Sequence, residues 1–141
     1  MTEKFTPIES LSRLTEDQKK EYYEQVCRHF DIPAHLNLLE YIYMDAGDGA
    51  RKLVLWAKKG ATDIWRDRHN ISIKSLVKED GDGYVMFTAT GENDKHRQEM
   101  SVGAAETKGK TGKVLSDAVM TAQTRAVRRM TLQFVGGGFL D

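Results

Sequence analysis

The stretch that most constrains the fold is residues 113–135, KVLSDAVMTAQTRAVRRMTLQFV. Its apolar side chains recur every three or four residues, and at 100° per residue they share one side of a helix: Leu115, Val119, Ala122, Ala126 and Met130. Arg125, Arg128 and Arg129 project from an adjacent arc, and the glycines at 136–138 end the helix. Such a helix packs on a sheet, and its arginines either line a basic groove or stay solvated at the surface.

Size and composition favour one soluble globular domain. The chain has 141 residues, which is enough to bury a core, and 40% hydrophobic with 30% charged residues is ordinary for this class. The apolar runs are too short to cross a bilayer, and the first residues lack the apolar core of a signal peptide. The single cysteine, Cys27, excludes an internal disulfide and favours a reducing cytoplasm. We expect a flexible lead-in over residues 1–13 and a single domain over residues 14–141.

The net charge of zero conceals an asymmetry. Residues 1–50 carry 10 acids and 5 bases, whereas residues 51–141 carry 11 acids and 16 bases. The basic excess is concentrated in residues 104–135, with 6 bases and 2 acids. This sorting suits a polyanionic partner on one face of the molecule, although helices also carry such biases for solubility.

The first half of the chain predicts a helix and a hairpin. Thr15 and Gln18 have the spacing of a capping box, and the following segment has a narrow apolar stripe that ends before Pro33. Residues 38–44 and 52–57 read as strands, and DAGDGA at 45–50 reads as the turn between them. A short helix is expected at about residues 62–69.

From residue 71 the periodicity changes to two. Residues 71–77, 84–90 and 97–103 predict three strands of a meander, and DGDG at 80–83 is a strong hairpin signal. A Lys- and Gly-rich loop, residues 108–112, then leads to the long helix. The sequence therefore predicts an α+β fold with a β-β-α-β-β-β-α core, an N-terminal helix, and the long C-terminal helix covering the sheet.

Motifs for catalysis are weak. Gly109-Lys110-Thr111 resembles part of a phosphate loop, but five residues rather than four separate it from Gly103, so we expect no ATP site. The four histidines lack paired spacing, and a zinc site would need further cysteines. Clustered acids of the kind that a metal-dependent nuclease needs are not evident. We therefore expect no enzyme activity, no metal and no cofactor.

Binding is the remaining interpretation. Basic side chains recur near turns and helix ends, where they can neutralise phosphates: Arg51, Lys52, Lys58, Lys59, Arg66, Arg68, Lys108, Lys110, Lys113, Arg125, Arg128 and Arg129. Single-strand binding also uses aromatic platforms for base stacking. Trp56, Trp65 and Tyr84 are the candidates, although tryptophan in an amphipathic segment more often belongs to the core.

Three runs resemble a known family: DGYVMFTATG, HRQEMSVGA and GKVLSDAVMTAQTRAVRRMTLQFVGGGFLD. They are similar to phage single-strand annealing proteins of the Redβ, RecT, Erf and Sak types, and to the annealing domain of a eukaryotic recombination mediator. The family order is also followed by residues 41–42, 47, 49 and 51–52 of the hairpin, by residues 60–61 and by the meander, so the resemblance spans residues 40–138. The order of elements is specific, but identities are sparse outside the last helix, where residues 118–119 and 124–128 match best.

The resemblance implies roles for particular residues. Arg125 and Arg128 match basic positions that line the inner single-strand groove, and Arg51 and Lys52 match bases on the hairpin that closes over the strand. Thr124 stands where the family often has lysine, which puts one contact in doubt. The partner-recruiting tail that often follows this core has no counterpart before residue 141.

The function implied by the resemblance is ATP-independent annealing of complementary single strands in phage recombination, inside a bacterial host. It implies single-stranded DNA and further copies of the chain, in a ring or helical filament, as partners. A single-strand binding protein or an exonuclease is a further expected partner. A second interpretation is a non-enzymatic accessory module that contacts a replication or recombination protein through its acidic first 50 residues. A metal-dependent nuclease is a third and weaker one.

Overall fold

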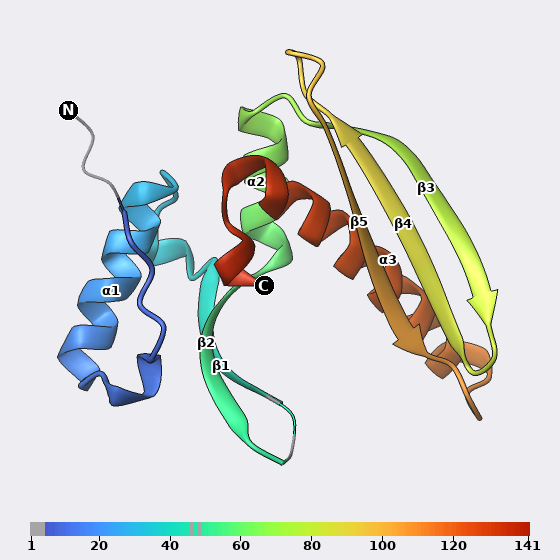
Figure 1. The fold of residues 1–141 in the computed structure, drawn as a ribbon, viewed down its shortest axis with the longest axis horizontal. Coiled ribbons are helices and arrows are strands. Elements are labelled where there is room, and N and C mark those ends of the chain that lie inside the picture. Colours follow the sequence, from blue (N-terminus) through green and yellow to red (C-terminus); the bar gives the residue numbers. More distant parts are fainter. Residues whose placement is uncertain (1–4, 46, 48) are drawn as a thin grey trace. The chain divides into compact units, whose positions relative to one another are not determined.

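The computed structural model describes residues 5–45, 47 and 49–141 (Figure 1). The first four residues of the expected lead-in, and Ala46 and Asp48 of the expected turn, lie outside the described residues. Contacts divide the chain into two compact units, Met1–Ala61 with Phe139–Asp141, and Thr62–Gly138. The boundary between these units falls inside α2 (Lys59–Arg68), within the range 14–141 that was expected to form a single domain.

The first unit is built on α1 (Glu16–His29). The predicted capping box is confirmed: the Gln18 amide donates to Thr15 Oγ1 over 3.2 Å, and the Thr15 amide donates to Gln18 Oε1 over 2.9 Å. The predicted apolar stripe, Tyr22, Val26 and Phe30, is buried. Short 3-10 helices, η1 (Leu11–Arg13) and η2 (Ala34–Leu36), flank α1.

The described part of the lead-in packs rather than projecting freely. Leu11 is buried, the Ile8 amide donates to the Tyr22 hydroxyl over 3.2 Å, and the Phe5 ring stacks on Phe139 with centroids 5.7 Å apart. The apolar side chains of Phe5 and Leu11 explain this packing, since leaving them in water would forgo their burial energy.

The hairpin of the first unit joins β1 (Leu39–Asp45) and β2 (Arg51–Ala57) in an antiparallel pair. Leu39, Leu53, Leu55 and Ala57 share one face of this pair and are buried. Tyr41 extends from the same face, and its hydroxyl donates to the Lys19 carbonyl over 2.6 Å. This bond and the buried stripe fix α1 against the hairpin.

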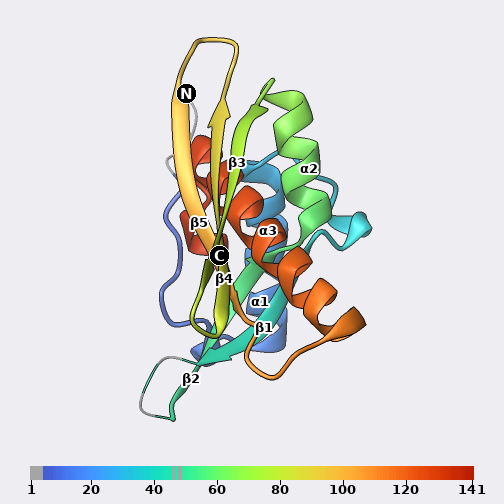
Figure 2. The same ribbon diagram turned by 90° about the vertical axis from the view of Figure 1, so that its right-hand side faces the viewer.

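The second unit contains an antiparallel sheet of β3 (Ser72–Gly81), β4 (Tyr84–Glu92) and β5 (Gln98–Glu106), in that order (Figures 1 and 2). Gly81 pairs with Tyr84, so Asp82 and Gly83 form the predicted hairpin turn, and Gly83 takes a positive φ of 80°. With α3 (Gly112–Val135) on the sheet, the α+β fold class and the β-β-α-β-β-β-α order are confirmed.

The core of the second unit lies between α3 and the sheet. Alternate residues of β4 face the helix and are buried, namely Val85, Phe87 and Ala89, and they meet Ala122, Ala126 and Met130 of α3. The apolar stripe from which the helix was predicted is therefore the side of α3 that packs against the sheet. Gly136 ends α3 in a left-handed conformation with φ 71°.

Some boundaries differ from the prediction. α2 begins at Lys59, because Gly60 and its neighbours continue the helix instead of forming a loop. β3 and β5 extend to Gly81 and Glu106, three or four residues beyond the predicted ends, because pairing with β4 continues to the turn. No helix formed by the described residues is long and apolar enough to cross a bilayer.

Candidate nucleic-acid interface

Three arginines of the second unit join α3 to β5, and we call Arg97, Arg125 and Arg129 the arginine seam. Arg125 Nη1 donates to the carbonyl of Ala104 over 2.7 Å, and Arg129 Nη1 donates to the carbonyl of Val102 over 3.1 Å. Arg97, just before β5, donates from Nη2 to the Gln133 carbonyl over 3.1 Å. The seam therefore joins the second half of α3 to β5 at three points along the chain.

The position of the seam follows from the helix and strand repeats. Arg125 and Arg129 are one turn apart on α3, about 6 Å along the helix axis. Val102 and Ala104 are two residues apart on β5, so their carbonyls point to the same side of the strand. β4 occupies one side of β5, and we infer that the two arginines cover carbonyls on its open edge.

Arg97 is the seam residue that the sequence interpretation missed. It lies outside the helical periodicity, and its guanidinium also pairs with Glu99 at 2.8 Å and lies 5.4 Å from the Phe134 ring centroid. Its side chain is still 51% exposed. The available signal was its place at the start of the predicted strand 97–103, but the sequence could not place it beside the end of α3.

Arginine stays charged under all ordinary conditions, so a guanidinium bonded to a carbonyl remains a cation with further N–H donors. Arg125 is exposed at the surface and Arg129 is half-buried. A row of fixed cations beside an exposed strand can hold a chain of phosphates. Contacts of this type read the backbone and not the base sequence.

The other predicted bases of the second unit have varied surroundings. Arg66 pairs with Asp63 and donates to Thr131 Oγ1 over 3.1 Å, so its charge is partly satisfied inside the unit. Lys113 lies in the first turn of α3, 3.5 Å from Asp117, with 90% of its side chain exposed. Lys108 and Lys110 lie in the loop before α3, and Arg68 is exposed near the end of α2.

Four predicted bases belong to the first unit or to its edge. Arg51 and Lys52 are exposed on β2, and the Arg51 guanidinium lies 5.9 Å from the Tyr43 ring centroid. Lys58 is half-buried, and its amide donates to the Leu38 carbonyl over 2.9 Å. Lys59 is exposed at the start of α2. These four bases belong to the first unit, whereas the seam belongs to the second.

Two predicted site residues are interior and need correction. Arg128 of α3 is 4% exposed, so its guanidinium is buried and not open to phosphate. Trp65 is 0% exposed, so its ring offers no free face for base stacking. Both residues contribute to packing, and neither belongs to an accessible phosphate or base site in this structure.

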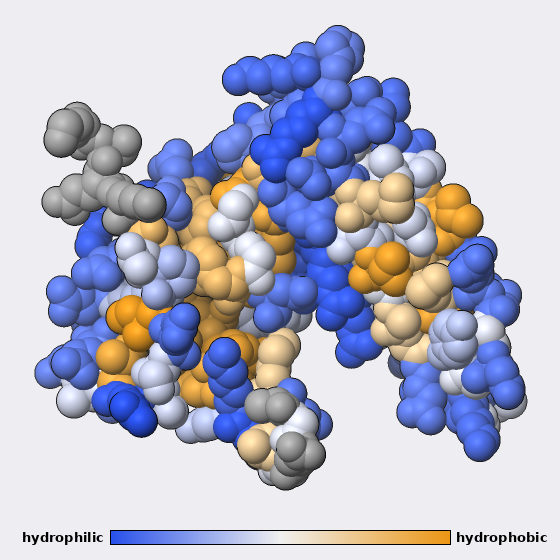
Figure 3. All heavy atoms as spheres, in the orientation of Figure 1, coloured by the Kyte–Doolittle hydropathy of each residue, from blue (hydrophilic) through white to orange (hydrophobic). Residues whose placement is uncertain are grey.

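The remaining aromatic candidates differ in exposure. Trp56 is half-buried on β2. Tyr84 is 45% exposed and lies on the face of the three-stranded sheet opposite α3. That face also exposes Val77, Met100 and Val102, and apolar side chains gather over this sheet in Figure 3.

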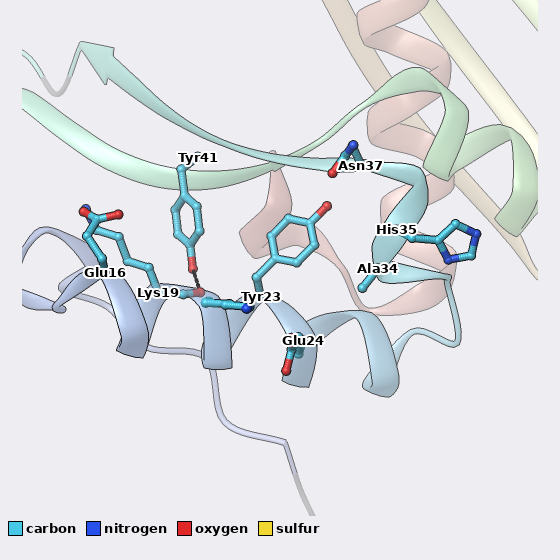
Figure 4. A pocket seen from close by; sticks show the side chains of 9 residues that line it. Glu16, Lys19, Tyr23, Glu24, Ala34, His35, Asn37 and Tyr41 are labelled. Carbon is cyan, nitrogen blue, oxygen red and sulfur yellow. Dashed lines mark hydrogen bonds and ion pairs between the residues drawn. The ribbon is translucent and has the colours of Figure 1, made fainter.

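A cavity of about 550 Å³ lies in the first unit, between α1, η2 and β1 (Figure 4). Tyr23 and Tyr41 form its aromatic walls. The Tyr23 hydroxyl donates to the Leu39 carbonyl over 3.1 Å, and the Tyr41 hydroxyl donates to the Lys19 carbonyl over 2.6 Å. Burial, reinforced by Tyr22 and Tyr23, raises the pKa of Tyr41 to about 12. The cavity rim mixes lysine and glutamate, so it lacks the uniform positive charge of a phosphate site.

No group of three or more metal-ligating side chains forms among residues 5–45, 47 and 49–141. Neither protein-family models nor curated proteins give a match to this chain.

Proposed function

We propose that this protein binds single-stranded DNA and anneals complementary strands without ATP, in phage homologous recombination within the cytoplasm of a bacterial host. The observation that carries the proposal is the arginine seam, in which Arg125 and Arg129 are fixed along the edge of β5. The element order agrees with the resemblance to annealing proteins, which supports the proposal independently of the seam.

The proposed mechanism is physical and involves no bond cleavage. The seam holds phosphates, the loop bases Lys108 and Lys110 extend the positive surface, and the base edges stay available for pairing. Neutralising each phosphate releases counterions, which drives binding and makes it sensitive to salt. Duplex formation is itself favourable, so ATP hydrolysis is not required.

Self-association completes the proposal. A single seam spans few nucleotides, whereas a ring or helical filament of copies joins the seams into a longer track. Additional contacts to a single-strand binding protein or an exonuclease would then deliver the DNA. Binding through phosphates is sequence-neutral, as annealing of arbitrary strands requires.

An annealing assay with two complementary oligonucleotides in the absence of ATP tests the proposal. We expect pairing faster than the spontaneous rate, with the enhancement decreasing as salt rises. Addition of ATP should leave the rate unchanged. Pairing at the spontaneous rate over a range of protein concentrations would contradict the proposal.

The second candidate is an accessory protein-interaction module. The observation in its favour is the exposed apolar face of the three-stranded sheet, where Val77 is 56% and Met100 60% exposed. Exposed apolar patches often mark protein contacts. A mobility shift with oligo-dT at moderate salt separates the two candidates, because an accessory module would give no shift.

A further inference from the structure

Gly103 lies in the centre of β5, paired with Phe87 of β4, and its backbone is buried against α3. A β-carbon at this position would overlap the backbone nitrogen of Ala126 and the carbonyl oxygen of Ala122, and would lie 2.8 Å from Arg125 Cβ. Two of these three atoms belong to the helix backbone, which has no rotamer through which to move away. The helix therefore approaches the strand closer than any other residue at 103 would permit.

The two central contacts of the arginine seam flank this glycine. Arg125 reaches the carbonyl of Ala104, directly after Gly103, and Arg129 reaches that of Val102, directly before it. Arg125 also follows Ala122 by three residues and precedes Ala126 by one, so it shares the helical turn that touches Gly103. The close approach and the two arginine–carbonyl bonds thus occur at one place.

We propose that Gly103 is a positioning residue for phosphate binding. Because it lacks a side chain, it seats α3 on β5 and so fixes the guanidiniums of Arg125 and Arg129 along the strand edge. This inference rests on the proposed function, since it assigns the residue that organises the same binding surface. Fixed guanidiniums bind better than mobile ones because less side-chain freedom is lost on binding.

A matched control exists on the neighbouring strand. Gly91 of β4 is also buried and faces α3, but a β-carbon there would meet the flexible side chain of Met130, with Cε at 2.9 Å, and the Phe134 ring at 3.1 Å. A thioether can change rotamer and yield space without moving the helix backbone. Gly91→Ala should therefore repack the core around Met130 and Phe134 while leaving Arg125 and Arg129, the two arginines that flank Gly103, in position.

The first experiment compares the affinities of the full chain and its variants for oligo-dT. Gly103→Ala should weaken binding about tenfold, which corresponds to about 1.4 kcal/mol, while Gly91→Ala should stay within about twofold of the unsubstituted protein. Arg125→Ala should also cost about tenfold alone, but less than about twofold in the Gly103→Ala background, because the arginine is already displaced. Unchanged affinity of Gly103→Ala, or an equal effect of Arg125→Ala in both backgrounds, overturns the inference.

The second experiment needs no DNA and separates this inference from the proposed function. In NMR spectra of ¹⁵N-labelled protein, the guanidinium protons of Arg125 should exchange slowly because Ala104 accepts one of them. This protection should be lost in Gly103→Ala and kept in Gly91→Ala. If the unsubstituted protein binds no oligo-dT, the proposed function fails, and the exchange data alone decide whether Gly103 positions Arg125.

The same spectra also test the inference if Gly103→Ala does not fold. In that case, the exchange rate of the Arg125 guanidinium protons in the unsubstituted chain is the deciding measurement. Slow exchange there supports the inference, and exchange at the rate of free arginine overturns it.

Discussion

The hydroxyl of Tyr41 donates a short hydrogen bond, 2.6 Å, to the carbonyl of Lys19 in α1. Only the protonated phenol can donate, and burial raises its pKa from the ordinary value near 10 to about 12. Between these values the folded state holds a proton that the unfolded state has lost. The free energy of unfolding should therefore be unaffected by Tyr41 below about pH 10 and should decrease as the pH rises to about 12.

Tyr41→Phe tests this linkage. Chemical denaturation at several alkaline pH values should show a smaller decrease in stability for the variant than for the unsubstituted chain. Tyr43→Phe, an exposed tyrosine on the same strand, is the matched control and should keep the full decrease. Equal pH profiles for all three proteins would contradict the role given to the Tyr41 hydroxyl.

Arg125 and Arg128 are close in sequence but differ in burial. Their alanine variants should therefore affect different properties, namely DNA binding for Arg125 and folding stability for Arg128. Arg125 is exposed beside β5, so Arg125→Ala should reduce the salt dependence of single-strand binding by about 0.7 in log–log slope per lost phosphate contact. Its thermal stability should change little. Titrations at three or more salt concentrations measure the slope, with Arg13→Ala, an exposed arginine outside the seam, as control.

Arg128 is 4% exposed, so Arg128→Ala should act on folding. Removing a long buried side chain loses its packing and its polar contacts, and we expect the free energy of unfolding to fall by about 1–3 kcal/mol. Denaturation curves measure this change. A stable Arg128→Ala variant with a reduced salt slope would instead place Arg128 in the DNA-binding surface.

At the scale of elements, the end of α3 depends on one glycine among three. Gly136 has φ 71°, and both its amide and that of Gly137 donate to the carbonyl of Leu132. A side chain in the left-handed conformation costs about 1 kcal/mol, so Gly136→Ala should destabilise the protein by about that amount. Gly138 lacks a positive φ and has open space around it, and Gly138→Ala should be neutral. Thermal denaturation of the pair gives the comparison, and equal effects would exclude the capping role.

The two edges of the three-stranded sheet are also unequal. The edge of β5 is covered by the arginine seam, whereas β3 has one partner strand, β4, and exposes nine of its ten residues. An uncovered strand edge is a template for pairing with another chain, and lysine side chains along it counteract that tendency. Lys74 and Lys78 occupy such positions on β3.

At the scale of the whole molecule, self-association requires a surface whose burial against a second copy is more favourable than its exposure to water. On the sheet face opposite α3, Val77 and Val102 flank Thr88 in one row across the strands, and no basic side chain interrupts the row. This face is thus suited to a second protein copy and not to phosphate. We expect Val77→Glu with Val102→Glu to lower the mass of the assembly in sedimentation velocity.

Ser116→Glu, which adds a charge on the exposed side of α3, should leave that mass unchanged. Unaltered assembly of the double variant would exclude the sheet face as the contact. A monomeric unsubstituted chain, with and without oligo-dT, would contradict self-association itself.

Local patterns predicted the elements because their causes are local. The capping box at Thr15, the Asp-Gly turn between β3 and β4, and the apolar stripe of α3 each act within a few residues, and all three are confirmed. Boundaries were less accurate, because pairing with β4 extends β3 and β5 beyond their own alternation. Two of the three seam arginines were predicted, and Arg97 was missed because it meets α3 at Gln133, 36 positions further along the chain.

The sequence by itself determined the fold class and the periodicity of its main helix, because these depend on the order of apolar and polar residues. Only the tertiary structure decided which arginines are accessible. Arg125 and Arg128 are three residues apart on the same helix, but one lies at a strand edge and the other in the interior. The physical reason is that burial is set by the elements that pack on each side of the helix, and sequence spacing does not specify them.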